Sequence, residues 1–323
     1  MSAWQEAPAG TERLASAWAD PGFPYRLAGS GWIWSDGQSS AGLTVRQARH
    51  DGERLIRLGI LRDVTGTLPT EALLAHARAL GLDAIACETA VGAAVPTSGD
   101  TRAWQALGNV LQIRRLPLWR TLHVPGHKVH RIGEQDTQAL AMHLEQYRTG
   151  LALAPTSSPE QFLEGLALCP GLTLDHFRIV RRDGTLVALA GLWAPGGFHL
   201  STAPGPGAMS RLALGAAGLL GRRSPWPTAR PGAAGPVGHV RVLACKPGQW
   251  DAVALLLSGL AGELRRWGLQ QLGINLREGD PLLGLLPGGP GASRKRTVWY
   301  LGVSEGASEA PTTPLDPNLV DPW

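Results

Sequence analysis

The sequence predicts a mixed α/β fold, with a largely antiparallel sheet flanked by helices and two consecutive domains of similar element order. Residues 54–87 have the pattern of a strand, a turn, a helix and a second strand, and residues 239–276 repeat this order. A crossover of this length joins strands that pair in parallel. Short turns at Asp36-Gly37 and Arg182-Asp183-Gly184 instead connect neighbouring extended segments, as in antiparallel hairpins.

The N-terminal region supplies the antiparallel part of the first domain. Residues 11–18 have the composition of a short helix, and residues 25–34 that of a strand. Trp32 and Trp34 are two positions apart, so both indoles lie on one face of that strand. A second strand is expected at 42–48, and none is expected before residue 11.

A buried strand and a turn lead into the first helix. Residues 54–61 are rich in Leu and Ile, which is typical of a strand covered on both faces. Thr65, Gly66 and Thr67 provide turn and capping chemistry, and Pro69 suits a first helical turn.

The helix that follows has an apolar stripe. Leu73, Ala77 and Leu80 recur at helical spacing, and Gly81 is placed to end the helix. The remaining elements expected in this domain are a buried strand at 83–87, a short helix at 102–107 and an extended segment at 111–122.

The second half of the chain repeats the order of the first half. The expected elements are a strand at 129–132, helices at 134–147 and from Ser158, a hairpin of 177–180 with 186–193, a strand at 239–245, a helix at 250–267, and strands at 271–276 and 297–303. Residues 195–236 are dense in Gly and Pro and form an insert with one apolar helix near 209–220. The expected domains are therefore 1–122 and 123–303, followed by a loose tail at 304–323 that is rich in Pro, Ser and Glu.

The composition indicates a globular protein with a sizeable core. Of the 323 residues, 44% are hydrophobic and 17% charged, and the formal net charge is only +4. Residues 1–20 lack the pattern of a signal peptide, and the weakly polar runs at 212–220 and 252–262 are far shorter than the roughly 20 residues that cross a bilayer. A cytoplasmic protein without membrane partners is expected.

The stretch from Arg54 to Arg120 resembles the acyl-coenzyme A half of GNAT-type N-acetyltransferases. In that superfamily a strand leads into a pyrophosphate-binding loop and a helix, then a further strand and a short helix with the pattern A-Y-x-x-L-G-F. Ala103-Trp-Gln-Ala-Leu-Gly-Asn109 is similar to that pattern, and residues 62–67 take the place of the loop. The resemblance covers nearly the whole chain in element order. It implies two tandem, partly degenerate GNAT-like domains, the first without its first strand.

The resemblance implies two places for acetyl-coenzyme A or another acyl-coenzyme A. A loop at a helix N-terminus attracts phosphate through free N–H groups and the helix dipole. The candidate residues are Leu61, Arg62, Asp63, Val64, Thr65, Gly66 and Thr67 in the first domain, and Cys245, Lys246, Gly248 and Gln249 in the second. An ordinary strand-to-helix turn is the alternative at both, because Gly66 comes one residue later than in the family loop, Asp63 opposes a pyrophosphate and Pro247 removes a donor. The first loop is preferred.

Glu88 is the candidate catalytic base, because it follows the buried strand at 83–87. A surface glutamate at a strand end is the alternative. Trp104 stands where many GNAT members have a tyrosine acid, and its indole N–H can only donate a hydrogen bond, so packing is its expected role. Cys87 and Cys245 have no neighbouring histidine in the sequence that would activate them, and inert thiols are expected.

Other site types have weaker support in the sequence. His123, His127 and His130 lie close together without a carboxylate or cysteine to complete a metal-binding pattern, so no metal site is expected. Basic runs such as Arg294-Lys-Arg296 leave nucleic-acid binding as a third possibility. The function implied by the resemblance is transfer of an acetyl or other acyl group from coenzyme A to a small-molecule or peptide amine. The alternative is a non-catalytic binding or scaffold protein that keeps a degenerate GNAT fold.

Overall fold

The structure, a computed structural model, describes most of the chain in separate stretches. These are residues 3–6, 31–36, 38–52, 54–99, 103–115, 127–133, 136–156, 158–168, 172–193, 237–267, 271–284, 286, 291–304 and 309–317. The helix expected at 11–18 and the insert at 195–236 lie outside the described residues, as does His123.

The chain divides into two compact units. Unit 1 contains Met1–Leu111, Glu145–Cys169 and Lys295–Trp323, and unit 2 contains Gln112–Leu144 and Pro170–Arg294. The chain therefore leaves unit 1, returns to it twice and ends in it. This division differs from the consecutive domains 1–122 and 123–303 expected from the sequence.

The sheet of unit 1 has the strand order β1-β2-β3-β4-β6-β14-β8. The strands are β1 (Ala3–Glu6), β2 (Gly31–Ser35), β3 (Ser40–Arg49), β4 (Leu55–Thr65), β6 (Ala84–Ala90), β8 (Gln105–Arg115) and β14 (Gly291–Gly302). Strands β4 and β6 pair in parallel, as the crossover length predicts, whereas β1 to β4 and the β6–β14 pair are antiparallel. Two expectations were wrong: a strand does precede residue 11, and residues 105–107 belong to strand β8 instead of a short helix.

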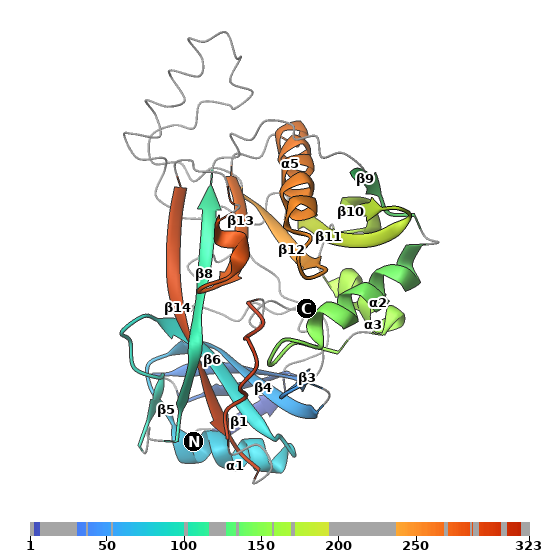
Figure 1. Ribbon diagram of the computed structural model, residues 1–323. Helices are drawn as coiled ribbons and strands as arrows, with labels where there is room; N and C mark the ends of the chain where they lie inside the picture. The colour runs from blue at the N-terminus through green and yellow to red at the C-terminus, as the bar shows by residue number, and fades with distance from the viewer. Residues whose placement is uncertain are drawn as a thin grey trace. The chain divides into compact units, whose positions relative to one another are not determined.

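Both faces of this sheet are covered within unit 1. Helix α1 (Thr70–Ala79) lies along one face, with Leu73 and Ala77 in a cluster of buried side chains from β2, β3, β4 and β6 (Figure 1). The opposite face packs against Ala152, Leu153 and Leu315. Two short strands, β5 (Leu68–Pro69) and β7 (Thr97–Ser98), form a separate parallel pair next to α1. Helix α3 (Pro159–Leu168) completes the unit.

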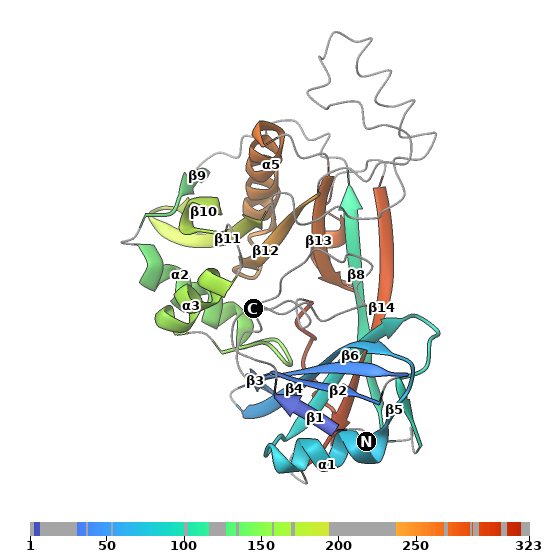
Figure 2. The same cartoon turned by 180° about the vertical axis from the view of Figure 1, so that it is seen from behind.

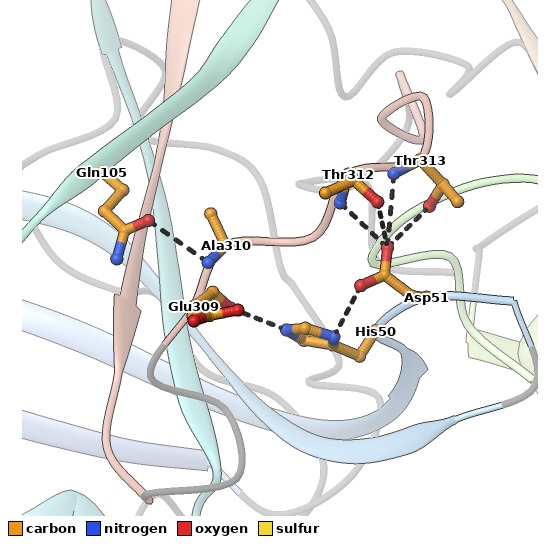
Figure 3. Close-up of polar contacts among 7 residues, drawn as sticks. All are labelled: His50, Asp51, Gln105, Glu309, Ala310, Thr312 and Thr313. Carbon is orange, nitrogen blue, oxygen red and sulfur yellow. Dashed lines mark hydrogen bonds and ion pairs between the residues drawn. The ribbon is translucent and has the colours of Figure 1, made fainter.

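Residues 309–317, placed in a loose tail by their composition, are held on unit 1 by specific hydrogen bonds (Figure 3). One carboxylate oxygen of Asp51 accepts bonds from the backbone N–H of Thr312 at 2.9 Å and of Thr313 at 3.3 Å. The Nε2 atom of His50 lies 3.0 Å from the carbonyl oxygen of Glu309. The C-terminal segment is therefore part of unit 1.

The C-terminal segment also pairs with the backbone of Ala152 in unit 1. The N–H of Ala152 donates to the carbonyl of Pro314 at 2.7 Å, and the N–H of Asp316 donates back to the carbonyl of Ala152 at 3.0 Å. Asp316 is buried, and its charge acts on the buried guanidinium of Arg148.

The sheet of unit 2 has the strand order β13-β12-β11-β10-β9. Its elements are β9 (His127–Arg131), β10 (Phe177–Arg182), β11 (Thr185–Trp193), β12 (Val237–Cys245) and β13 (Gln271–Arg277), with α5 (Trp250–Arg266) and the short helices η2 (Leu174–His176) and η3 (Pro281–Gly284). Helix α2 (Thr137–Arg148) begins in unit 2 and ends in unit 1. The predicted hairpin and helix are confirmed as β10–β11 and α5.

A buried ion pair connects α5 to the sheet of unit 2. Arg178 on β10 lies 2.7 Å from a carboxylate oxygen of Glu263 on α5, and both residues are buried. The same guanidinium donates to the carbonyls of Asp175 and Phe177. The guanidinium of Arg178 thus donates to one carboxylate and two carbonyls, and these hydrogen bonds offset the cost of burying the charged pair. The pair therefore holds α5 in one position on the sheet.

Candidate functional site

The parallel strands β12 and β13 of unit 2 part after a short paired stretch. They pair only from Val237 with Gln271 to His239 with Gly273. Figures 1 and 2 show the two strands starting side by side and then diverging. Within the described stretches, residues 240–245 of β12 therefore run on without pairing to β13, and main-chain groups along such an edge need another partner.

A bulge in β12 accompanies this divergence. On the other side, β12 stays paired with β11, but Leu189 and Gly191 of β11 face Ala244 and Arg241, so β12 has one extra residue here. Val242, inside the extra length, has a φ of 56°, which is uncommon for a β-branched residue. A bulge bends a strand and redirects its edge, and this one bends β12 next to the segment that leaves β13.

The candidate loop of the second domain follows directly. The Cys245 thiol donates to the carbonyl of Lys246 at 3.1 Å and to that of Gln249 at 3.2 Å. Burial, with a smaller effect from the charge of Asp251, raises the pKa of this thiol to about 12. Cys245 therefore remains a protonated thiol that holds the loop, as expected for an inert cysteine.

Gly248 is the open point of the same loop. Its φ is 79°, and no described atom lies within 4 Å of the place where a Cβ would stand. The long helix α5 begins two residues later at Trp250. A ligand anion can thus approach the backbone at Gly248 and the positive end of the α5 dipole.

In unit 1 the parallel strands β4 and β6 also separate, next to the first candidate loop. Strands β4 and β6 pair from Leu58 with Ala84 to Leu61 with Cys87, and then separate. Beyond that point β4 stays paired with β3, where Gly42 and Ser40 face Arg62 and Thr65, so β4 has one extra residue. The residues predicted for this loop are thus mostly the end of a strand.

The first loop is filled by the protein's own atoms. Gly66 has a φ of 71°, and a Cβ there would stand 2.2 Å from the Oγ atom of Ser39. The N–H of Thr67 donates to that hydroxyl at 3.3 Å, and the N–H of Leu68 donates to the carbonyl of Pro96 at 3.2 Å. Within the described residues, Gly66 is explained by packing against Ser39.

Side chains also pack beside the first loop. Trp104 is 6% exposed and belongs to the same apolar cluster as Leu61, Leu68 and Cys87. Burial and the neighbouring charge of Glu88 raise the pKa of the Cys87 thiol to about 12. These two residues have the packing roles that the sequence predicted for them.

Glu88, the predicted base, lies on β6 just beyond the point where β6 leaves β4. Its side chain is 6% exposed, and a carboxylate oxygen lies 3.4 Å from the Nε atom of Arg296. The carboxylate is thus in an ion pair with a cation on β14. Its role as a base stays a prediction.

His143 on α2 is a candidate that the sequence reading did not select. It is 5% exposed, its imidazole is hydrogen-bonded to the backbone of Ala244, and its Nε2 atom has no partner among the described residues. A signal was present, because His143 falls within the apolar stripe of Leu140, Leu144 and Tyr147.

No group of three or more His, Cys, Asp or Glu side chains in the described stretches is arranged to hold a metal ion. None of the helices described is both long enough and apolar enough to span a membrane.

Comparison with known proteins identifies the fold. No protein-family profile matches the sequence, and no curated protein matches it. Among solved structures, the chain is similar to the GCN5-related glucosamine N-acetyltransferase region of a fungal multi-domain β-N-acetylglucosaminidase, with a TM-score of 0.54 and 11% identity over 93% of this chain and 38% of that chain.

Two further structures have weaker similarity. A protein of unknown function from Enterococcus faecalis V583, a probable N-acyltransferase, has a TM-score of 0.49 and 8% identity over 85% of this chain and 62% of that one. Saccharomyces cerevisiae N-myristoyltransferase with bound myristoyl-CoA has a TM-score of 0.49 and 9% identity over 87% of this chain and 75% of that one. The chain thus spans only 62% and 38% of the Enterococcus and fungal chains.

The chain has the acyl-coenzyme A N-acyltransferase fold of the GNAT superfamily. The mixed α/β class and the resemblance of the chain to this fold are confirmed. The motif at 103–109 was matched to a short helix of the family, but residues from Gln105 onward form strand β8. At this level of identity the similarity defines the fold alone, because one fold can carry many different activities.

Proposed function

We propose that the chain is an acyl-coenzyme A-dependent N-acyltransferase and that the cofactor binds at the parting of β12 and β13. The observation that carries the proposal is the end of pairing at His239 and Gly273, beside the N-terminus of α5. An extended ligand with amide groups can pair with the free edge of β12, as a peptide pairs with a sheet edge. Its pyrophosphate then meets Lys246, Gly248 and the helix dipole.

The proposed reaction is attack of an amine nitrogen on the thioester carbonyl. A C–N bond forms, the C–S bond breaks with its electron pair going to sulfur, and the proton lost by the amine returns to the thiolate. The protein contributes alignment of the two reactants and fixed dipoles at the carbonyl. The acyl group, acetyl or longer, is left open by this proposal.

The two partings of strands support a tandem arrangement of GNAT-like cores, one in each unit. In unit 1 the loop from Leu61 to Thr67 packs against Ser39 and Pro96, so we propose that this unit supports the fold while unit 2 binds acyl-coenzyme A. The first loop and Glu88 remain the predicted site of unit 1. The same packing favours the second candidate function, a non-catalytic scaffold, if unit 2 also fails to bind.

Calorimetric titration with acetyl-coenzyme A tests the proposal. Gly248→Asp places a negative charge where the pyrophosphate is expected, and we expect at least a tenfold loss of affinity. Gly184→Asp is the matched control, because Gly184 has a φ of 77° and similarly open surroundings in the β10–β11 turn. The control should bind like the wild type.

Three outcomes separate the candidates. Absence of binding by the wild type removes the enzyme proposal and leaves the scaffold. Equal affinity of Gly248→Asp and wild type for acetyl-coenzyme A removes the proposed site in unit 2 and favours binding at the first loop, Leu61 to Thr67. Release of free thiol from acetyl-coenzyme A in the presence of amines contradicts the scaffold.

A further inference from the structure

His50 of unit 1 lies between two groups that can only accept a hydrogen bond. Its Nε2 atom is 3.0 Å from the carbonyl oxygen of Glu309, and its Nδ1 atom is 3.1 Å from a carboxylate oxygen of Asp51 (Figure 3). The contact at Nδ1 is one of charge, because this atom makes no hydrogen bond within the described residues. The side chain of His50 is only 4% exposed, so water screens these contacts poorly.

Neither neutral tautomer of His50 suits this position. A proton on Nε2 alone bonds to the carbonyl of Glu309 but leaves the lone pair of Nδ1 beside the carboxylate of Asp51. A proton on Nδ1 alone favours the carboxylate but turns the lone pair of Nε2 toward the carbonyl. Only the imidazolium cation carries a proton on both nitrogens. The contacts of the C-terminal segment, residues 309–317, therefore favour a charged His50.

Asp51 supplies the opposite charge. Its Oδ1 atom accepts the N–H of Thr312 at 2.9 Å and of Thr313 at 3.3 Å, and the hydroxyl oxygens of both threonines lie 3.4 Å from it. Burial alone would raise the pKa of Asp51, but these hydrogen bonds and the charge of His50 outweigh burial and lower that pKa below 3.8. Asp51 is thus a carboxylate at neutral pH, and the proton of the pair resides on His50.

The other titratable and charged groups around His50 come from the start of β4, from β14 and from the C-terminal segment. The N–H of His50 donates to the carbonyl of Arg54, and the ring centroids of His50 and Tyr300 are 5.9 Å apart. Burial raises the pKa of Tyr300, so this residue is a neutral phenol. The guanidinium of Arg54 disfavours a second cation nearby, whereas the carboxylates of Asp51 and the exposed Glu309 favour one.

We propose that the C-terminal segment is a proton-dependent strap, which binds unit 1 while His50 is an imidazolium and loosens when His50 loses its proton. Loss of the proton turns one attractive contact into a repulsive one, either at Glu309 or at Asp51. Binding of the segment therefore takes up one proton, so it strengthens as pH falls and is lost as pH rises. In strong acid it weakens again, because Asp51 is then protonated.

The loosening should be confined to the first part of the segment. The His50–Asp51 pair holds residues 309–313 only. The N–H of Asp316 donates to the carbonyl of Ala152 at 3.0 Å, and Leu315, which is 7% exposed, packs in a buried cluster on that face of the sheet. The end of the segment thus has its own anchors, and the amide of Asp316 serves as an internal reference.

Amide hydrogen exchange of the full chain, followed by NMR between pH 5.5 and 8.5, tests the proposal. Protection factors remove the intrinsic pH dependence of exchange. We expect those of Thr312 and Thr313 to fall by about fivefold or more from pH 6 to pH 8, since one linked proton changes an equilibrium by up to about tenfold per pH unit. The protection factor of Asp316 should change by less than about twofold.

Three variants provide the second arm. His50→Gln keeps a donor for the carbonyl of Glu309 and is neutral at every pH, so protection of residues 312 and 313 should be low and independent of pH. Asp51→Asn keeps an oxygen that accepts the backbone N–H groups and removes the carboxylate charge, so it should also flatten the pH dependence. His130→Gln, at an exposed histidine of β9 in unit 2, should behave like the wild type.

Nitrogen-15 NMR of the imidazole rings reads the protonation of His50 in the wild type directly. We expect both ring nitrogens to be protonated at pH 7. A neutral ring at a pH where Thr312 and Thr313 are protected overturns the proposal, even if no variant folds. Protection at these residues that is constant with pH, or that changes in parallel with Asp316, overturns it as well. Persistence of the pH dependence in a folded His50→Gln assigns it to another group and also overturns the proposal.

Discussion

Replacing Gly66 by alanine should destabilise unit 1 far more than the same replacement of a glycine that also has a positive φ but has no atom near the position of the new Cβ. A Cβ at Gly66 would stand 2.2 Å from the Oγ atom and 2.8 Å from the Cβ atom of Ser39, closer than real contacts allow. Ser39 cannot move away cheaply, because its N–H donates to the carboxylate of Asp36 at 2.6 Å. The side chain of Ser39 also accepts the N–H of Thr67.

The expected magnitude follows from three contributions. A left-handed backbone at alanine costs roughly 1–2 kcal/mol, loss of the hydrogen bond to Thr67 costs about 1 kcal/mol, and overpacking costs about 1–3 kcal/mol. Gly66→Ala should therefore lower the free energy of unfolding by about 3–6 kcal/mol. Gly92→Ala is the control, because Gly92 has a φ of 81° with no described atom within 4 Å, and it should cost only the backbone contribution.

Urea unfolding followed by tryptophan fluorescence measures both variants. The same substitution of Gly66 in a Ser39→Gly background should cost little more than Gly92→Ala, because the Oγ and Cβ atoms are gone and only the Cα atom of residue 39 remains, at 3.2 Å. If Gly66→Ala is no more destabilising than Gly92→Ala, packing against Ser39 does not explain this glycine. The first loop would then again be open to a ligand.

Other predictions concern the buried groups of the chain. In a Cys169→Ser background, Cys87 and Cys245 should react with a thiol reagent at pH near 8 only after unfolding, because burial raises both pKa values to about 12; rapid labelling of the folded protein would contradict this. Glu263→Gln should destabilise the protein by about 3 kcal/mol by leaving a buried guanidinium without its counter-charge, and an apolar replacement of both partners should recover part of the loss in thermal unfolding. The lowered pKa of His143 means that the unfolded chain binds its proton first as pH falls, so stability should decrease between pH 6.5 and about pH 4, and His143→Asn should flatten that decrease in urea unfolding.

The elements with strong local patterns could be predicted from the sequence. The helical stripes of α1 and α5 and the turn at Arg182-Asp183-Gly184 are fixed by neighbours in the chain, and the structure has them at the expected places. Local patterns failed at 102–107, where a helix was predicted and the structure has the start of strand β8. Residues 105–115 form a strand whose Asn109 accepts a bond from Thr297 at 3.0 Å, a partner far away in the sequence.

The candidate site could be predicted only in outline. The order of strand, loop and helix located both loops, and the short pairing of β4 with β6 and of β12 with β13 follows from no local pattern. The obstruction at Gly66 comes from Ser39 on another strand, so the spacing of glycines alone could not distinguish a packed loop from an open one. His143 stood in a visible apolar stripe, but its contact with Ala244 depends on tertiary packing.

The arrangement of unit 1 along the chain has a consequence for how this protein is made. Strand β14 lies between β6 and β8 in the sheet, and residues 309–317 hydrogen-bond to Asp51 and Ala152. A ribosome synthesises β14 long after β6, so the N-terminal strands emerge long before their central neighbour exists. We expect the nascent chain to expose an unpaired edge of β6 until β14 has emerged, and the removal of residues 309–317 to disturb the surroundings of Asp51, which lies far back in the sequence.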